Sequence, residues 1–212
     1  MAGCRRGDRI DLRRTVAMEV RGQVGRPATT SPGTRPRRVV LLLDVSGSMA
    51  PYARALARFA HAAVSGRRRG QVEVFALGTR LTRITRELAT HDPDAALARA
   101  AAAVADWDGG TRLGAGLRQF NDGCGVRGIA RGAVVVLLSD GWDRGEPDEL
   151  ADEAARLRRV AHRLVWVNPL KASPGYAPLA RGMAAALPHV DEFVDGHCLD
   201  SLVSLAEVVS RP

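Results

Sequence analysis

The sequence predicts an α/β fold, with a doubly wound, mostly parallel central sheet and helices on both faces. Short, nearly uninterrupted apolar runs at 39–44, 72–77, 133–139 and 164–168 are typical of strands buried on both faces. Segments of helical period separate these runs, and strands that alternate with helices form parallel sheets. A length of 212 residues and an apolar content of 46% suit one globular domain with its own core.

The helices are predicted from their apolar faces and their start signals. In 51–65 the apolar residues fall on one helical face. Asp92 followed by Pro93 is the pattern of an N-cap and a proline at the first helical position, and it opens a helix at 94–107. The other expected elements are helices at 113–121, 147–162, 176–187 and 199–209 and a short strand at 192–194.

The chain is expected to divide into a basic N-terminal arm and linker at 1–36 and one domain at 37–212. The arm shows apolar alternation at 15–20, which favours a strand or hairpin, and then a linker rich in Gly, Pro, Ser and Thr. Ten arginines and three acids lie within 1–38, so this segment carries most of the net charge of +8. Such an arm suits nucleic acid or an acidic partner surface, or is a solvated tail. The absence of aromatic residues among these arginines argues against a base-stacking platform.

Cysteine use and hydropathy indicate the compartment. The number of cysteines is odd, with Cys4, Cys124 and Cys198, and their spacing suits neither a zinc site nor a disulfide framework. A reducing compartment is therefore favoured. No stretch approaches the roughly 20 apolar residues of a membrane span, and charges throughout the first 20 residues argue against a signal peptide. We expect a cytoplasmic protein. Cys124 lies between glycines and is expected in a loop as an incidental thiol.

Oxygen-bearing side chains follow three of the predicted elements. Asp44 ends a buried strand, Ser46 and Ser48 follow it at alternate positions, and Gly47 allows a tight turn between them. Thr111 follows two glycines before a helix, and Asp140 ends another buried strand. Ligands bind at the carboxyl ends of strands in such sheets, and short oxygen ligands suit a hard cation such as Mg²⁺. The sequence therefore predicts one cation site at this edge.

These residues resemble the metal-ion-dependent adhesion site (MIDAS) of von Willebrand factor A (VWA) domains, in order and in context. The resemblance implies that Asp44, Ser46 and Ser48 hold one divalent cation, directly or through water. It also implies that Thr111 and Asp140 alternate between direct and water-mediated contact. The cation is expected to be Mg²⁺, with Mn²⁺ or Ca²⁺ as alternatives. A partner protein then supplies an Asp or Glu oxygen to the open position.

The resemblance narrows to the CoxE-like branch of VWA proteins. The stretches that carry it lie at 11–15, 41–49, 138–143, 166–170, 182–188 and 191–193. Members resemble accessory proteins that work with a MoxR-type AAA+ ATPase, some of them in the maturation of molybdenum hydroxylases such as carbon monoxide dehydrogenase. Members usually carry a longer, helical N-terminal region, and this chain departs from the family pattern there.

A rim around the cation site is predicted from Trp107, Gly110, Trp142 and Asp143. The two tryptophans either shape a docking surface, since Trp is enriched in binding hot spots, or pack at strand ends. Asp143 either adds negative potential or caps a turn. The five histidines show no ligand spacing and are expected at the surface or at helix ends.

The favoured function is a non-enzymatic adaptor that binds a partner protein through the cation. One alternative is a Mg²⁺-dependent phosphoester hydrolase with Asp44 as nucleophile, but such enzymes carry an acid/base Asp where Ser46 stands. A second alternative is nucleic-acid binding through the basic arm. The sequence has no phosphate-cradling Gly-x-x-x-x-Gly-Lys-Ser/Thr loop, so we do not expect ATP hydrolysis by this chain.

Overall fold

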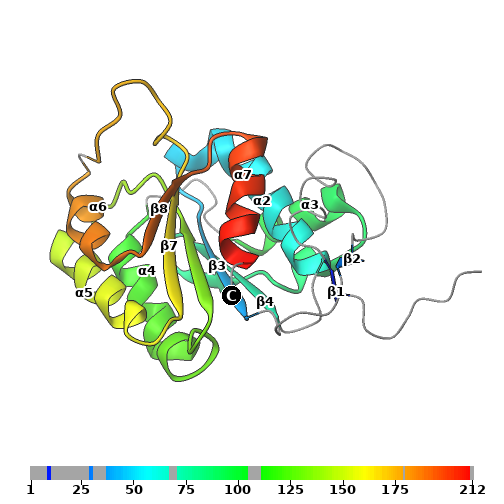
Figure 1. Ribbon diagram of the computed structural model, residues 1–212, viewed down its shortest axis with the longest axis horizontal. Helices are drawn as coiled ribbons and strands as arrows, with labels where there is room; N and C mark the ends of the chain where they lie inside the picture. Colours follow the sequence, from blue (N-terminus) through cyan, green and yellow to red (C-terminus); the bar gives the residue numbers. More distant parts are fainter. Residues whose placement is uncertain are drawn as a thin grey trace, which may run out of the picture.

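A computed structural model describes residues 9–10, 29–30, 37–66, 71–104, 111–178 and 180–210. Its central feature is a six-stranded sheet of order β5-β4-β3-β6-β7-β8 (Figure 1). Its strands are β3 (Val39–Asp44), β4 (Val72–Leu77), β5 (Leu81–Arg83), β6 (Val134–Leu138), β7 (Arg163–Asn168) and β8 (Glu192–Asp195). All neighbouring pairs are parallel except β4 and β5. The predicted α/β class with a mostly parallel sheet is confirmed.

The helices cover both faces of this sheet. On one side lie α2 (Ala50–Ser65), α3 (Pro93–Ala103) and α7 (Leu199–Ser210), and on the other lie α4 (Leu113–Phe120), α5 (Pro147–Arg158) and α6 (Arg181–Ala186) (Figure 1). The 3₁₀ turns η1 (Gly47–Met49), η2 (Glu87–Ala89) and η4 (Leu187–His189) and the π-helical segment η3 (Asn121–Ile129) complete the described elements.

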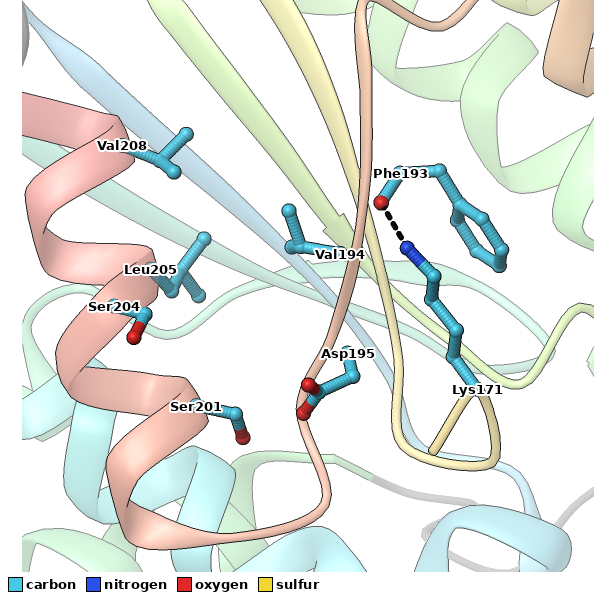
Figure 2. Close-up of a pocket in the computed structure, with 8 residues that line it drawn as sticks. All are labelled: Lys171, Phe193, Val194, Asp195, Ser201, Ser204, Leu205 and Val208. Atoms are coloured by element: carbon cyan, nitrogen blue, oxygen red, sulfur yellow. Dashed lines mark hydrogen bonds between the residues drawn. The ribbon is translucent and has the colours of Figure 1, made fainter. Parts of the chain in front are cut away.

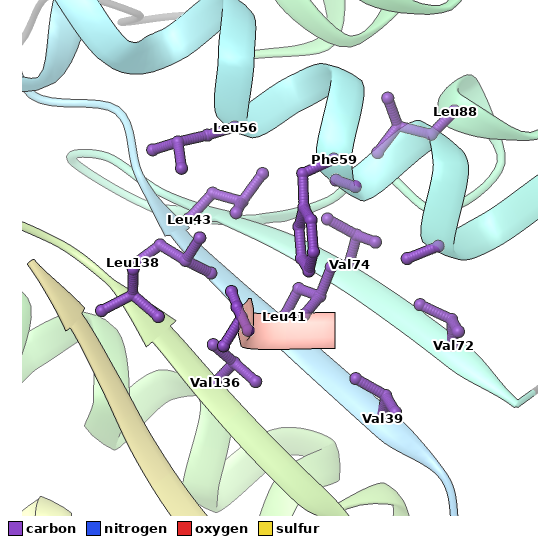
Figure 3. Packing of buried hydrophobic residues seen from close by; sticks show 14 of the residues in the cluster. Val39, Leu41, Leu43, Leu56, Phe59, Val72, Val74, Leu88, Val136 and Leu138 are labelled. Carbon is purple, nitrogen blue, oxygen red and sulfur yellow. The ribbon is translucent and has the colours of Figure 1, made fainter. Parts of the chain in front are cut away.

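Strand β3 is the centre of the core because both of its faces are covered. Val39, Leu41 and Leu43 point to the cluster beneath α2, where Phe59 is also buried (Figure 3). The alternate residues Val40 and Leu42 belong to the cluster on the opposite face, as the two-residue period of a strand requires. This explains why the sequence of β3 is a continuous apolar run before Asp44. Truncation of Phe59 to Ala is expected to cost about 3–5 kcal/mol.

The register of β3 and β6 fixes where the two strands end. Val39 pairs with Val134 and Leu43 with Leu138, so residues 44 and 139 lie side by side at the ends of the two strands. Strand β4 runs parallel on the other side of β3, with Leu77 opposite Asp44. The carboxyl ends of the three central strands therefore form one edge.

Several boundaries differ from the sequence prediction for local physical reasons. The helix expected at 176–187 begins at Arg181, because Pro174 and Pro178 disfavour helical backbone at the residues before them. The helix expected at 113–121 continues as η3, which places Cys124 in a helical segment and not in a loop. The helix expected at 94–107 ends at Ala103, and 105–110 lie outside the described residues.

The described part of the N-terminal arm pairs with itself. Strand β1 (Arg9–Ile10) pairs antiparallel with β2 (Thr29–Thr30). Thr29–Thr30 falls within the stretch expected to be linker, so part of that stretch is strand. The strand expected at 15–20 lies outside the described residues. Among the described residues, no helix has the length and apolar character needed to span a membrane.

Candidate metal centre

The carboxylate of Asp44 lies at the end of β3, where it is 3% exposed and receives three hydrogen bonds. Oδ1 accepts from the backbone N–H of Ser46 and from the hydroxyl of Thr111, both at 2.9 Å. Oδ2 accepts from the hydroxyl of Ser139 at 2.6 Å. Desolvation by burial raises the pKa of Asp44, although the hydrogen bonds from Ser139, Ser46 and Thr111 act in the opposite direction.

The two serines of the first loop present their hydroxyls on one side. Ser46 precedes η1 with extended backbone, and its Oγ lies 3.1 Å from Oγ of Ser48. Ser46 is buried and Ser48 is exposed. Because the backbone N–H of Ser46 is bonded to Asp44, the turn holds both hydroxyls next to the carboxylate, with Ser48 at the solvent side.

Asp140 reaches the same edge from β6. It is 4% exposed, and its Oδ1 accepts from the backbone N–H of Trp142 at 3.0 Å. Among the hydrogen bonds of the described residues, none joins its carboxylate to the other four predicted ligands. Its neighbour Ser139 makes the link, since that hydroxyl bonds to Asp44. A hydrogen bond thus joins Asp44 directly to Thr111, whereas Asp140 is linked to Asp44 only through the hydroxyl of its chain neighbour Ser139.

Thr111 stands before α4, and the loop after β6 holds it there. Thr111 is 2% exposed, and its carbonyl accepts from the backbone N–H of Arg144 at 3.4 Å. Oδ1 of Asp143 accepts from Leu113 N–H at 2.9 Å, and Oδ2 accepts from Gly114 N–H at 3.3 Å. Asp143 therefore caps the first turn of α4, and its Oδ1 also accepts from Gly145 N–H at 2.9 Å in the turn of its own loop.

Gly141 is required by the turn that follows Asp140. Its φ is +84°, a conformation that L side chains rarely adopt. A Cβ at this position would lie 2.5 Å from Cε and 2.8 Å from Cβ of Met183 on α6. The glycine thus allows the loop to turn against α6, and it sets the direction in which Trp142 and Asp143 leave the sheet.

Of the predicted rim residues, Trp142 and Asp143 belong to the described part of the chain. Trp142 is 72% exposed and is the only large apolar side chain that is exposed among the described residues. It is therefore not packed at a strand end. Trp107 and Gly110 lie outside the described residues.

Three residues that support the site were not assigned a role from the sequence. Ser139 orients Asp44 through its hydroxyl. Trp166 donates from Nε1 to the carbonyl of Ser139 at 3.0 Å, and Asn168 donates from Nδ2 to the carbonyl of Asp140 at 2.9 Å. Both donors lie on β7, so the neighbouring strand fixes the loop that carries Asp140. The polar ending of the apolar run 164–168 was the available signal for Asn168.

The donor set fits a hard divalent cation. It contains two buried carboxylates and neutral hydroxyls, and these oxygens are the ligands that Mg²⁺ and Ca²⁺ prefer. Among the described residues, no group of three or more His, Cys, Asp or Glu side chains is placed to hold a metal. No described Lys, Arg or His pairs with the buried carboxylate of Asp44, so its charge has no counter-ion among the described residues.

A separate pocket of about 260 Å³ lies between β8 and α7 (Figure 2). Strands β6 and β7 separate β8 from β3 in the sheet. Lys171 reaches along the pocket, where its amine donates to the carbonyl of Phe193 and lies 4.6 Å from the centre of that ring. The amine is thus already bound within the protein, and the pocket shares no lining residue with the predicted metal site.

The histidine prediction is wrong for one residue. His61 on α2 is 2% exposed, and its Nε2 lies 2.8 Å from the carbonyl oxygen of Thr90. It is a buried structural residue that ties α2 to the chain before α3. Cys124, in η3, is half-buried, and desolvation raises the pKa of its thiol, so the thiol is not activated.

Solved structures share the fold. Proximal thread matrix protein 1 from the mussel byssus, in a structure with a zinc-occupied MIDAS motif, is 14% identical with a TM-score of 0.53. The match covers 82% of this chain and 47% of that one, so this chain spans about half the length of the mussel protein. BatB from Bacteroides thetaiotaomicron is 13% identical with a TM-score of 0.52, and 82% of this chain and 97% of that one are covered.

A third similar structure is an aerotolerance-related membrane protein from Bacteroides fragilis, at 12% identity and a TM-score of 0.54. Its match covers 81% of this chain and 97% of that one. No curated protein matches the chain in sequence.

The family model described as "VWA domain containing CoxE-like protein" matches residues 3–202. VWA domains mediate protein–protein interaction. The chain belongs to the family of VWA domain containing CoxE-like proteins.

Proposed function

We propose that this chain is a non-enzymatic adaptor that binds a partner protein through one divalent cation, Mg²⁺ in the first instance. The proposed ligands, which bind the cation directly or through water, are Asp44, Ser46, Ser48, Thr111 and Asp140. A bound cation would supply positive charge and a coordination position for an Asp or Glu oxygen of the partner. The chain's own role is to hold the ligands in place and to present the rim around them.

The observation that carries this proposal is the environment of Asp44. A carboxylate that is 3% exposed normally pairs with a cation, because burial of an unpaired charge costs several kcal/mol. Here it meets the hydroxyls of Thr111 and Ser139 and a backbone N–H, all neutral donors. A divalent cation beside these hydroxyls would supply the missing counter-charge. The zinc-occupied MIDAS motif of the mussel protein, whose fold is similar, supports a cation site in this chain.

An adaptor is favoured over a phosphoester hydrolase by the surroundings of the same carboxylate. A nucleophilic Asp44 would need an acid/base group nearby, and its described contacts are Ser46, Thr111 and Ser139. A hydroxyl has too high a pKa to serve as that group near neutral pH. The oxygens at the site are suited to hold a cation, and no described His, Lys or Cys contacts Asp44.

The proposed partner is a MoxR-type AAA+ ATPase, and the proposed process is the maturation of a metalloenzyme such as a molybdenum hydroxylase of the carbon monoxide dehydrogenase type. Membership of the CoxE-like family supports this pairing. The test is the affinity of the purified chain for the MoxR-type ATPase of the same genome, measured by biolayer interferometry in Mg²⁺ and in EDTA. Surface acids of the ATPase are then changed one at a time to the matching amides.

We expect binding in Mg²⁺, loss of binding in EDTA, and one acid whose change to the amide has the same effect as EDTA. A Gln offers a similar oxygen without the charge, so it should bind the cation far more weakly. The matched control is a neighbouring acid of the ATPase, whose amide variant should bind normally. Affinity that is undiminished in EDTA would show that the partner does not bind through a cation.

A further inference from the structure

The backbones of two arginines adjoin Thr111 at the carboxyl edge of the sheet. Arg112 follows Thr111 in the chain, and the backbone N–H of Arg144 donates to the carbonyl of Thr111 at 3.4 Å. Both side chains are exposed. Neither guanidinium forms an ion pair or a hydrogen bond with another described residue. We call Arg112 and Arg144 the arginine pair.

The described acids near the arginine pair form no ion pair with it. The carboxylate of Asp143 accepts the backbone N–H groups of Leu113, Gly114 and Gly145. Glu146 and Asp148, at the start of α5, are exposed, and neither pairs with a described cationic side chain. The guanidinium groups thus remain available to a carboxylate from outside.

Trp142 provides an apolar surface on the same loop. Its backbone N–H donates a 3.0 Å hydrogen bond to Oδ1 of Asp140, while its side chain is 72% exposed. An exposed Trp on the same loop as an exposed Arg is typical of a protein-binding surface, in which Trp and Arg are enriched. The combination fits a partner segment that carries both acidic and apolar side chains.

We propose that the arginine pair is a subsite for a second carboxylate, so that the partner presents an acidic segment of two or more acids. This inference rests on the proposed function, in which a first carboxylate binds the cation held beside Thr111. In an extended segment alternate side chains point to the same side, and each residue spans about 3.3 Å. The second acid is therefore expected two residues from the first, as in Glu-x-Glu.

The test uses short synthetic Gly/Ser peptides on beads, which carry a single Glu, the sequence Glu-Ser-Glu, or Glu-Ser-Gln. Binding of the full chain is measured in Mg²⁺ and in EDTA for the wild type and for R112Q/R144Q. R112K/R144K keeps the charge. R131Q is the matched control, because Arg131 is an exposed arginine just before β6, at the opposite edge of the sheet. Circular dichroism checks that all variants fold.

For the wild type in Mg²⁺ we expect Glu-Ser-Glu to bind at least about twofold more tightly than Glu-Ser-Gln, since each exposed ion pair contributes about 1.4-fold to fivefold. R112Q/R144Q should remove this gain and keep the binding of the single-Glu peptide. R112K/R144K should keep part of the gain, and R131Q should keep all of it.

Suppose that the single-Glu peptide binds in a Mg²⁺-dependent way. The subsite alone is then overturned if the wild type binds Glu-Ser-Glu no more tightly than Glu-Ser-Gln, or if R112Q/R144Q keeps the preference for Glu-Ser-Glu. If no peptide binds in a Mg²⁺-dependent way, the proposed function fails and the subsite fails with it. A single-stranded oligothymidylate serves as a further probe. If it binds more tightly than Glu-Ser-Glu through the arginine pair, the partner is nucleic acid and the acidic-segment proposal is overturned.

Discussion

The hydroxyl of Thr111 donates a 2.9 Å hydrogen bond to Oδ1 of Asp44, although 67 residues separate the two in the chain. Strand β3 brings one partner to the edge of the sheet, and the start of α4 brings the other. The same carboxylate is bonded by Ser139, 95 residues away from Asp44. Three distant segments thus meet at one buried carboxylate, which explains why the candidate site lies at this edge.

The Thr111 contact leads to a first prediction about the cation. Thr111→Val keeps the shape of the side chain and removes its oxygen, so we expect the affinity for Mg²⁺ to fall by about 10- to 100-fold. Thr111→Ser keeps the hydroxyl and should lose much less. Isothermal titration calorimetry of both variants checks this. Equal affinities for the Val and Ser variants would remove Thr111 from the ligand set.

The contacts of Asp44 predict different stabilities for two of its variants in EDTA. Asp44→Ala leaves the donors on Ser46, Thr111 and Ser139 without their acceptor, and a buried unpaired donor costs about 1–3 kcal/mol. Asp44→Asn keeps one acceptor oxygen and should cost less. Urea unfolding gives both free energies. A variant pair of equal stability would mean that these hydrogen bonds contribute little to the folded domain.

The cap formed by Asp143 predicts a change in stability that is separate from cation binding. Asp143→Ala removes the acceptor for the N–H groups of Leu113 and Gly114 and should lower the free energy of unfolding by about 0.5–2 kcal/mol. Asp143→Asn should lower it less. Because Asp143 is not among the proposed ligands, the Mg²⁺ affinity of the Asn variant should stay near that of the wild type. Thermal unfolding and calorimetry measure the two effects separately.

Gly132 and Gly141 both have positive φ, and Ala substitutions at these positions distinguish the energetic cost of backbone strain from that of steric crowding. Gly132→Ala adds a methyl group into open space at φ +64°, so it should cost about 1–2 kcal/mol from backbone strain alone. Gly141→Ala adds the same strain and a clash with Met183, which should bring about 1–3 kcal/mol more. Urea unfolding of both variants tests this order. A larger loss for Gly132→Ala would contradict the described packing of the loop against α6.

Much of the fold could be predicted because buried strands have a clear sequence pattern. The bounds of β3 and β4 were predicted to the residue, since each is an apolar run with a polar or Gly-rich ending. Strand β5 was missed because it is an edge strand of three residues, Leu-Thr-Arg, with no apolar run. The continuation of α4 into η3 was missed because its glycines are typical of loops.

For the candidate site, the sequence predicts which oxygens lie at one edge of the sheet, but it does not specify the hydrogen bonds among them. The role of Ser139 depends on the register of β3 against β6, which brings its hydroxyl level with Asp44. The role of Asp143 depends on the loop meeting the start of α4, a long-range contact that no local pattern specifies. The burial of His61 depends on the packing of α2, which places Thr90 within reach of its ring.

The proposed function requires one cation held at Asp44, and binding of Mn²⁺ followed by electron paramagnetic resonance tests this. We predict that the wild-type chain binds one Mn²⁺, that Mg²⁺ displaces it, and that Asp44→Asn removes the binding. Asp148→Asn, an exposed acid on α5, is the matched control and should bind like the wild type. If the Asp44→Asn variant bound Mn²⁺ as tightly as the wild type, the cation would not be held at this site.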